Sequence, residues 1–266
     1  MVAVRLRCGG DVRLARLASK EKEMMRLAAD PARRPKRFYK TATVVNGALH
    51  LDGRPAKTRA GSPLTFASRA VMAEIEREWT AQQTSIDFAA MPITRFVSTV
   101  IDLGDSEAGK WRRELLSFLK SDLVCYRAGA PPALVGRQNA AWNPLLDWAS
   151  IRCGISLISR VGVSHIEQPA DAILSGERRF AAASAAELIG MKAAAEIAGS
   201  AVIAIALAQG AFPAAALFDA SRVDDAFQAE RWGVDSEAAE RAARLRRDFL
   251  DAGRFLDCLR KTPQAA

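Results

Sequence analysis

The sequence predicts an α+β fold, in which a small N-terminal domain of antiparallel β-meander and helix precedes a C-terminal, all-α orthogonal bundle of helices. Three observations predict this order. Two tight-turn signals occur close together within residues 44–55 (VVNGALHLDGRP), a helix-capping serine follows at position 68, and nearly all of the chain beyond residue 133 has helical patterning. Strands with a helix packed on them form one layer, and successive amphipathic helices form a bundle.

Changes of composition divide the chain into three parts. Residues 1–36 form a basic leader that we expect to be disordered. Residues 37–129 form the N-terminal α+β domain and residues 130–262 the helical domain, because the run GAPPA at 129–133 interrupts the pattern with one glycine and two prolines. The chain of 266 residues is long enough for two such domains, and half of its residues are hydrophobic, which is typical of globular proteins.

The expected meander consists of strands within residues 37–45 and 48–57. The Asn-Gly pair at 46–47 and the Asp-Gly pair at 52–53 have the residue types that type I′ turns require, because both turn residues must take positive φ. A meander with turns this well marked presents either a catalytic group or a contact surface for a partner.

The first expected helix runs from an N-cap at Ser68 to about Gln82. Met72, Ile75 and Trp79 recur at three- and four-residue spacing, so they form its buried face. We therefore interpret Trp79 as a core residue.

Two further helices and a short β-like segment complete the expected N-terminal domain. Pro92 near the first turn begins a short helix that ends at Gly104, and a second helix follows at 106–120. The segment 122–128 (DLVCYRA) has the β-like pattern.

The rest of the chain is predicted to be almost entirely helical. Residues 134–154 form a helix with a bend or break near Pro144, since proline lacks the amide donor, and residues 155–163 are extended. Three successive helices then occupy 178–209, 213–231 and 236–261. Their end signals are Gly210 and Gly233 as C-terminal caps, Pro213 as a helix start, and Asp235 or Ser236 as an N-cap.

One segment has the length of a membrane span. Residues 197–218 contain no charge. However, alanine contributes little transfer energy, and Gln209, Gly210 and Pro213 divide the segment into two shorter helices. We interpret it as a buried central helix and expect no insertion into a membrane.

The net charge of +8 comes from the start of the chain. Residues 1–40 hold 12 Lys and Arg against 4 acidic residues, and the remainder has 26 of each sign. An Arg-rich start resembles a mitochondrial transit peptide, but the preference for Arg over Lys and the abundance of Ala favour a bacterial protein with a disordered or weakly helical basic extension. An upstream start codon, with Met24 or Met25 as the true start, is one explanation of this extension. We expect a bacterial cytoplasmic protein, with the mitochondrial matrix as the alternative.

No pattern of an enzyme or of a cofactor site is present. The two histidines, His50 and His165, accompany no nucleophile motif, and phosphate-binding glycine loops and H-E-x-x-H are missing. The four cysteines lie far apart without a C-x-x-C pair, which is typical of idle thiols in a reducing compartment; they are Cys8, Cys125, Cys153 and Cys258. We expect no catalytic residue, no metal and no cofactor.

Six fragments, taken in order, resemble the Atp12 family of F1-ATPase assembly chaperones. The likeness spans residues 37–259. The fragments are RFYKTATV, LDGRPAKTRAGSPL, AEIEREWTAQQ with MPITR, FLKSDLVCYRA, RQNAAWNPLLDW, and AFQAERWG followed by an acidic helix. Each fragment is weakly specific alone, and their order carries the resemblance.

The resemblance implies a holding chaperone and not an enzyme. Members of this family bind the α subunit of the F1 sector before it meets the β subunits, and they shield an interface that would otherwise aggregate. The family pattern has two glutamates before the aromatic-Gln pair, where this chain has two aspartates. Carried over to this chain, the expected contact residues are Arg54, Lys57, Asp224, Asp225, Gln228, Trp232, Glu237 and Glu240. We expect a monomer when the protein is free.

The acidic residues also have a structural interpretation. Glu237 and Glu240 fall in the first two turns of the last helix, where the helix dipole favours negative charge without any function. Acidic residues elsewhere on the predicted helices are usually part of a face exposed to solvent and likewise need no function.

Two alternative functions stay open at this stage. A hydrolase with an unrecognised site would have a deep pocket with converging polar groups around His50 or His165. A nucleic-acid-binding module would depend on the basic leader at residues 1–36.

Overall fold

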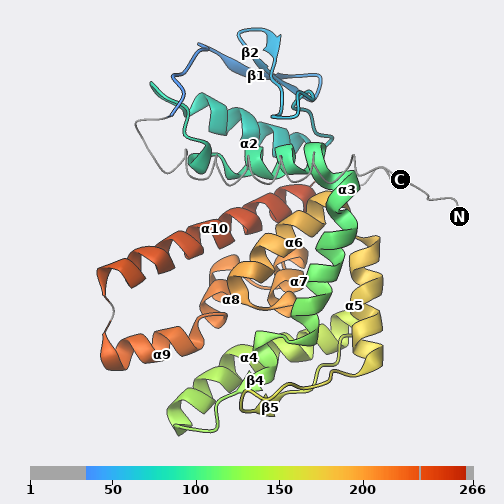
Figure 1. The fold of residues 1–266 in the computed structure, drawn as a ribbon, viewed down its shortest axis with the longest axis vertical. Coiled ribbons are helices and arrows are strands. Elements are labelled where there is room, and N and C mark those ends of the chain that lie inside the picture. The colour runs from blue at the N-terminus through green and yellow to red at the C-terminus, as the bar shows by residue number, and fades with distance from the viewer. Residues whose placement is uncertain (1–33, 234, 262–266) are drawn as a thin grey trace, which may run out of the picture.

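The computed structural model describes residues 34–233 and 235–261. Figure 1 shows a layer of strands with helix α2 (Arg69–Thr80) at one end of the molecule and a larger group of helices below it. This arrangement confirms the predicted α+β class. The leader predicted at residues 1–36 lies almost wholly outside the described residues.

The meander is a three-stranded antiparallel sheet in chain order. Its strands are β1 (Ala42–Val45), β2 (Ala48–Leu51) and β3 (Arg54–Pro55). Both predicted turns are confirmed: φ is 51° at Asn46 and 75° at Gly47. The second turn repeats the positive φ angles at residues 52–53, with 48° and 77°.

Helix α2 begins as predicted and packs on the sheet. The side chain of Ser68 accepts a hydrogen bond from the amide of Val71, and Met72, Ile75 and Trp79 are buried. The core interpretation of Trp79 is thus confirmed.

Helix α3 (Pro92–Lys120) is one long helix, where the sequence predicted two helices separated at Gly104. Gly104 is buried inside α3, and a Cβ atom built on it would lie 3.2 Å from the Cβ of Ala185. Gly104 therefore allows close packing of α3 against the segment at Ala185 and does not end a helix. As a result, α3 runs from the N-terminal layer down the side of the helical group (Figure 1).

Helix α4 (Pro132–Cys153) is also continuous, so of the bend or break predicted near Pro144 the break does not occur. Pro144 is exposed while its neighbours Trp142 and Leu145 are buried. The carbonyl group that lacks a donor therefore faces water, and the buried side of the helix is undisturbed.

The predicted helix at 178–209 is in fact three helices. These are α5 (Ala170–Ala182), α6 (Ala185–Ala198) and α7 (Ala201–Gln209). Ser184 and Glu187 form a capping box that starts α6. Gly199 ends α6 in the left-handed conformation, and the side chain of Ser200 caps α7.

The predicted helix at 213–231 is divided as well. Helix α8 (Ala214–Ala220) ends at Ser221, and α9 (Val223–Trp232) begins in a new direction. The last helix, α10 (Ser236–Arg260), has Asp235 as its N-cap, as predicted. Gly210 ends α7 with a φ of 63°, which confirms that cap.

The remaining elements are short. Strand β4 (Tyr126–Arg127) pairs in parallel with β5 (Arg160–Val161), within the two segments predicted to be extended. The 3-10 turns are η2 (Phe88–Ala90) and η3 (Leu123–Cys125).

Two hydrophobic cores are joined by the two longest helices. The first core lies between the meander and α2 and includes Val97 of α3 and Phe255 of α10. The second fills the helical group and includes Leu115 of α3 and Leu256 of α10. Because α3 and α10 contribute to both cores, they fix the N-terminal layer on the bundle. The domain boundary at residue 129 stays a prediction.

Helix α7 is the centre of the second core. Residues 201–207 are all buried, and within the described ranges no helix has the length and hydropathy to cross a membrane. The interpretation of the uncharged run as a buried helix is confirmed.

Candidate partner-binding surface

Helix α9 projects from the bundle and is held to α4 at two places. Phe227, 6% exposed, is its buried residue. Arg137 of α4 lies over the ring of Phe227, 5.3 Å from its centroid, and donates two 2.7 Å hydrogen bonds to the carboxylate of Glu230. A bidentate pair of this kind restrains direction as well as distance.

The second attachment involves Asp224. Its Oδ1 accepts a 2.7 Å hydrogen bond from Nε2 of Gln138, a buried residue of α4. The side-chain Oε1 of Gln138 accepts a hydrogen bond from the amide of Ala128. The backbone carbonyl of Gln138 accepts another from the guanidinium of Arg127. Asp224 is therefore engaged within the molecule and links α9 to the turn after β4.

The other predicted contact residues of α9 point to solvent. Asp225 forms an exposed ion pair with Arg222, at 3.2 Å. Gln228 is exposed, and Trp232 at the end of the helix is 77% exposed. Tryptophan is enriched among the residues that contribute most to protein interfaces.

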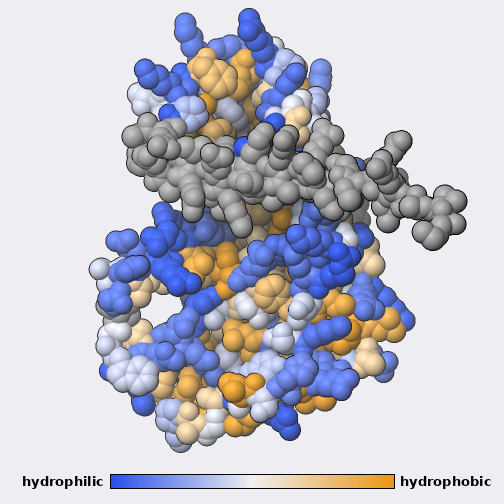
Figure 2. Space-filling view, in the orientation of Figure 1, coloured by the Kyte–Doolittle hydropathy of each residue, from blue (hydrophilic) through white to orange (hydrophobic). Residues whose placement is uncertain are grey.

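The first turns of helix α10 are exposed. All residues from 236 to 244 are exposed, and Figure 2 shows an opening between α9 and the start of α10. Asp235 is engaged as the cap and accepts from the amide of Ala238 at 2.8 Å. Glu237 is exposed, and Glu240 lies 3.5 Å from Arg244. We call α9 together with residues 235–247 the α9–α10 arm.

Charge is segregated along the α9–α10 arm. Residues 224–240 hold six acidic side chains and one arginine, whereas residues 241–247 hold four arginines and no acid. Asp224, Glu230 and Asp235 make internal contacts. The exposed carboxylates that do not hold the arm in place are therefore those of Asp225, Glu237 and Glu240, of which Asp225 and Glu240 pair with nearby arginines.

Arg54 and Lys57 lie elsewhere. Both are exposed and follow the second turn of the meander. In Figure 1 the meander lies at the top of the molecule, whereas α9 lies at the lower left of the helical group. The structure thus places the predicted α9 and α10 residues on the α9–α10 arm, with an opening between the two helices, and does not place these two cations beside them.

Among the described residues, the side chains that would carry chemistry do not converge; Cys8 lies outside these residues. His50 is half-buried, with Nδ1 3.1 Å from the carbonyl of Ala48, while His165 is exposed on another segment. Burial raises the pKa of the Cys125 thiol to about 12 and also raises that of Cys258. Over the described ranges, no group of His, Cys, Asp and Glu is suited to hold a metal.

Sequence reasoning missed the residues that orient the α9–α10 arm. Arg137 and Gln138 stand in the fragment RQNAAWNPLLDW, and Glu230 stands in AFQAERWG. Arg137 and Glu230 are separated by more than 90 positions in the sequence, so no local spacing indicates that they pair. A buried glutamine on an otherwise apolar helix face was the available signal.

Comparison with known proteins decides the family. The profile described as "ATP12 chaperone protein" matches residues 36–150. A crystal structure of a chaperone candidate from Agrobacterium tumefaciens is 38% identical, with a TM-score of 0.80, covering 85% of this chain and 86% of that one. Atp12 from Paracoccus denitrificans is 32% identical, with a TM-score of 0.79, covering 84% of this chain and 98% of its own.

The chain belongs to the ATP12 chaperone family. A third match is a point mutant of the Paracoccus denitrificans protein, again 32% identical with a TM-score of 0.79. The resemblance found in the sequence is thus confirmed. Membership of this family supports a chaperone role in F1-ATPase assembly. The structural matches extend over more of this Atp12 family protein than the profile does.

Proposed function

We propose that this protein binds the unassembled F1 α subunit and shields its subunit interface from aggregation. The observation that carries the proposal is the α9–α10 arm, which is fastened at α4 but leaves an aromatic side chain and three carboxylates exposed. A rigid arm loses little conformational entropy on binding, so its exposed groups are effective contacts.

The arm is the surface that contacts the α subunit in this proposal. Trp232 is the apolar anchor, and Asp225, Gln228, Glu237 and Glu240 surround it. An aromatic anchor with a polar rim is the usual anatomy of an energetic centre in a protein interface. By presenting acidic helix starts, the helical domain mimics part of a neighbouring subunit. Asp224 contributes by holding α9 in place.

Arg54 and Lys57 form a separate contact in this proposal. They lie on the meander, at the end of the molecule away from α9 (Figure 1). A client that reaches both would extend from the helical group to the meander. The protein acts as a cytoplasmic monomer, without a chemical step of its own.

Copurification tests the proposal. The tagged protein is recovered from cell extract and the bound polypeptides are identified. The F1 α subunit should be the main partner, without β subunits. Recovery of assembled F1, or of no α subunit, would refute the proposed role.

Removal of residues 1–36 distinguishes the proposed chaperone from the nucleic-acid-binding alternative. The proposed chaperone keeps its α-subunit binding after this truncation. A binder that depends on the basic leader loses an affinity that falls steeply with salt.

A further inference from the structure

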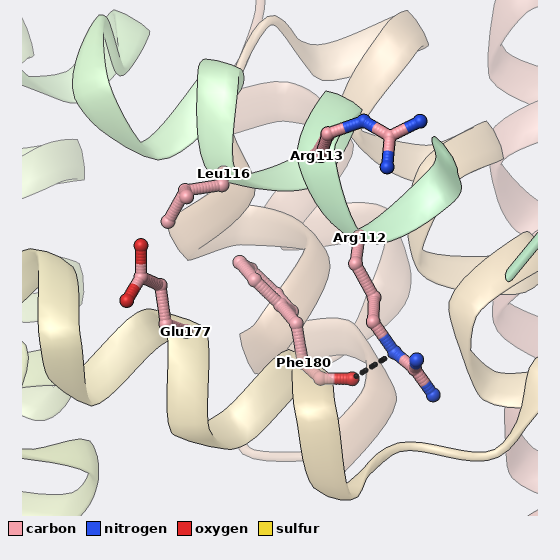
Figure 3. A pocket seen from close by; sticks show the side chains of 5 residues that line it. All are labelled: Arg112, Arg113, Leu116, Glu177 and Phe180. Atoms are coloured by element: carbon pink, nitrogen blue, oxygen red, sulfur yellow. Dashed lines mark hydrogen bonds between the residues drawn. The ribbon is translucent and has the colours of Figure 1, made fainter. Parts of the chain in front are cut away.

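A cavity of about 200 Å³ opens between α3 and α5, on the side of the bundle away from α9 in Figure 1. Figure 3 shows the five side chains that line it. They are Arg112, Arg113 and Leu116 of α3, and Glu177 and Phe180 of α5.

The cavity is preformed because contacts on either side of it fix the two helices. On one side, Gly176 lies so close to α3 that a Cβ atom built on it would clash with the side chain of Leu119. On the other, the guanidinium Nε of Arg112 donates a 3.1 Å hydrogen bond to the carbonyl of Phe180 (Figure 3). That carbonyl lies in the last turn of α5 and has no donor within its helix.

The floor of the cavity is apolar and its rim is charged. The ring of Phe180 is 1% exposed, and half-buried Leu116 lies opposite it. Glu177 and Arg113 lie on opposite sides of this ring in Figure 3. Within the part of the chain that the structure describes, the side chains of Glu177 and Arg113 form neither a hydrogen bond nor an ion pair.

The volume of the cavity and the charges around it determine which side chain of a partner can bind there. A buried apolar cavity of roughly 150 Å³ already holds a benzene molecule, so this one accommodates a single leucine, methionine or phenylalanine side chain. The lining includes two guanidinium groups, those of Arg112 and Arg113, and one carboxylate, that of Glu177. An acidic group beside the apolar side chain is therefore attracted to the guanidinium groups of Arg112 and Arg113 and repelled from the carboxylate of Glu177.

We propose that this cavity is a second anchor point for the client, which takes an apolar side chain flanked by an acidic residue that faces Arg112 and Arg113. The inference rests on the proposed holding function and adds a site remote from the α9–α10 arm. Pockets that receive one buried side chain, ringed by polar groups, contribute strongly to binding.

Photo-cross-linking tests this site directly. A benzophenone amino acid replaces Arg113 at the rim, Glu240 on the α9–α10 arm, or Arg69 as an exposed control on α2. Each full-length variant is irradiated with purified F1 α subunit. We expect cross-links from positions 113 and 240 but not from 69, and the fragment joined at 113 should hold an apolar residue next to Asp or Glu.

The outcomes separate the two proposals. A cross-link at 240 without one at 113 overturns the cavity proposal and leaves the proposed function standing. No cross-link at either position overturns both. A fragment at 113 without an acidic residue overturns the stated occupant. As a second measure, Arg113→Glu should weaken α-subunit binding roughly three- to fivefold, while Arg69→Glu leaves it unchanged. Equal affinity of the two variants would also overturn the proposal.

Discussion

Gln138 on α4 donates a 2.7 Å hydrogen bond to the carboxylate of Asp224 on α9. Together with the pair of Arg137 and Glu230, this contact sets the direction of α9 before any partner arrives. The predicted contact residues therefore differ in kind. Asp224 positions the α9–α10 arm, and Trp232, Glu237 and Glu240 are presented by it.

Asp224→Ala should lower the free energy of unfolding by about 1 to 2 kcal/mol, because the amide of buried Gln138 loses its acceptor. Urea denaturation followed by circular dichroism measures this change. The matched control is Asp225→Ala, which removes only an exposed ion pair and should change stability by less than about 0.5 kcal/mol. Equal losses in both variants would contradict the positioning role.

Glu78→Ala should destabilise the junction of the two layers by about 3 kcal/mol. Buried Glu78 of α2 accepts 2.8 Å hydrogen bonds from the amides of Ile93 and Thr94 at the start of α3. It also lies 3.6 Å from Arg254 of α10. Its removal leaves two helix-start amides without their acceptor, and Arg254 loses one of its carboxylate partners while it keeps Glu74 and Asp251.

Glu78→Gln is the comparison for this change. It keeps one acceptor oxygen and should lose less stability than the alanine variant in the same thermal melt. A melting temperature of Glu78→Ala equal to that of the native protein would show that this carboxylate does not join the layers.

Asp122 should make stability rise as the pH falls from 7 to 5. Burial raises the pKa of its carboxyl from 3.8 to about 6, against the hydrogen bonds that it accepts from Val124 and Val202. Between these two pKa values the folded state binds a proton that the unfolded state does not. The native protein should therefore gain about 1 kcal/mol at pH 5.

The pH effect is isolated by the Asp122→Asn variant, which does not titrate at this position. The difference in unfolding free energy between the native protein and this variant is measured in urea at pH 7 and at pH 5. It should shift in favour of the native protein at the lower pH. A difference that is independent of pH would contradict the raised pKa.

Trp232→Ala should weaken binding of the F1 α subunit by roughly 30-fold or more, which corresponds to about 2 kcal/mol. The melting temperature should stay within a few degrees, because this side chain is 77% exposed and contributes little to the core. Titration calorimetry or surface plasmon resonance gives the affinity. Unchanged affinity would remove Trp232 from the proposed contact surface.

Local signals in the sequence were sufficient for the meander and for several helix ends. The Asn-Gly turn at 46–47, the cap at Ser68 and the N-cap at Asp235 depend on neighbouring residues alone, and all three are confirmed. Gly104 was misinterpreted because a glycine that ends a helix and a glycine that lets two helices approach look alike without the partner helix.

The candidate site was predictable only in part. The exposed residues at 225–240 follow from the family resemblance, since the sequence alone gives the helix dipole as a sufficient reason for their charge. The role of Asp224 depends on Gln138, which lies 86 positions away in the chain, and no spacing rule links the two. The cavity at Phe180 likewise depends on the packing of α3 against α5.

Light scattering of the F1 α subunit, diluted from denaturant in the presence of the chaperone, tests the central claim most directly. The native protein should suppress aggregation, and so should Glu167→Lys, which reverses an exposed glutamate outside the α9–α10 arm. Glu237→Lys or Glu240→Lys should abolish this protection while the melting temperature stays within a few degrees. Equal protection by all four proteins, or by none, would contradict the account.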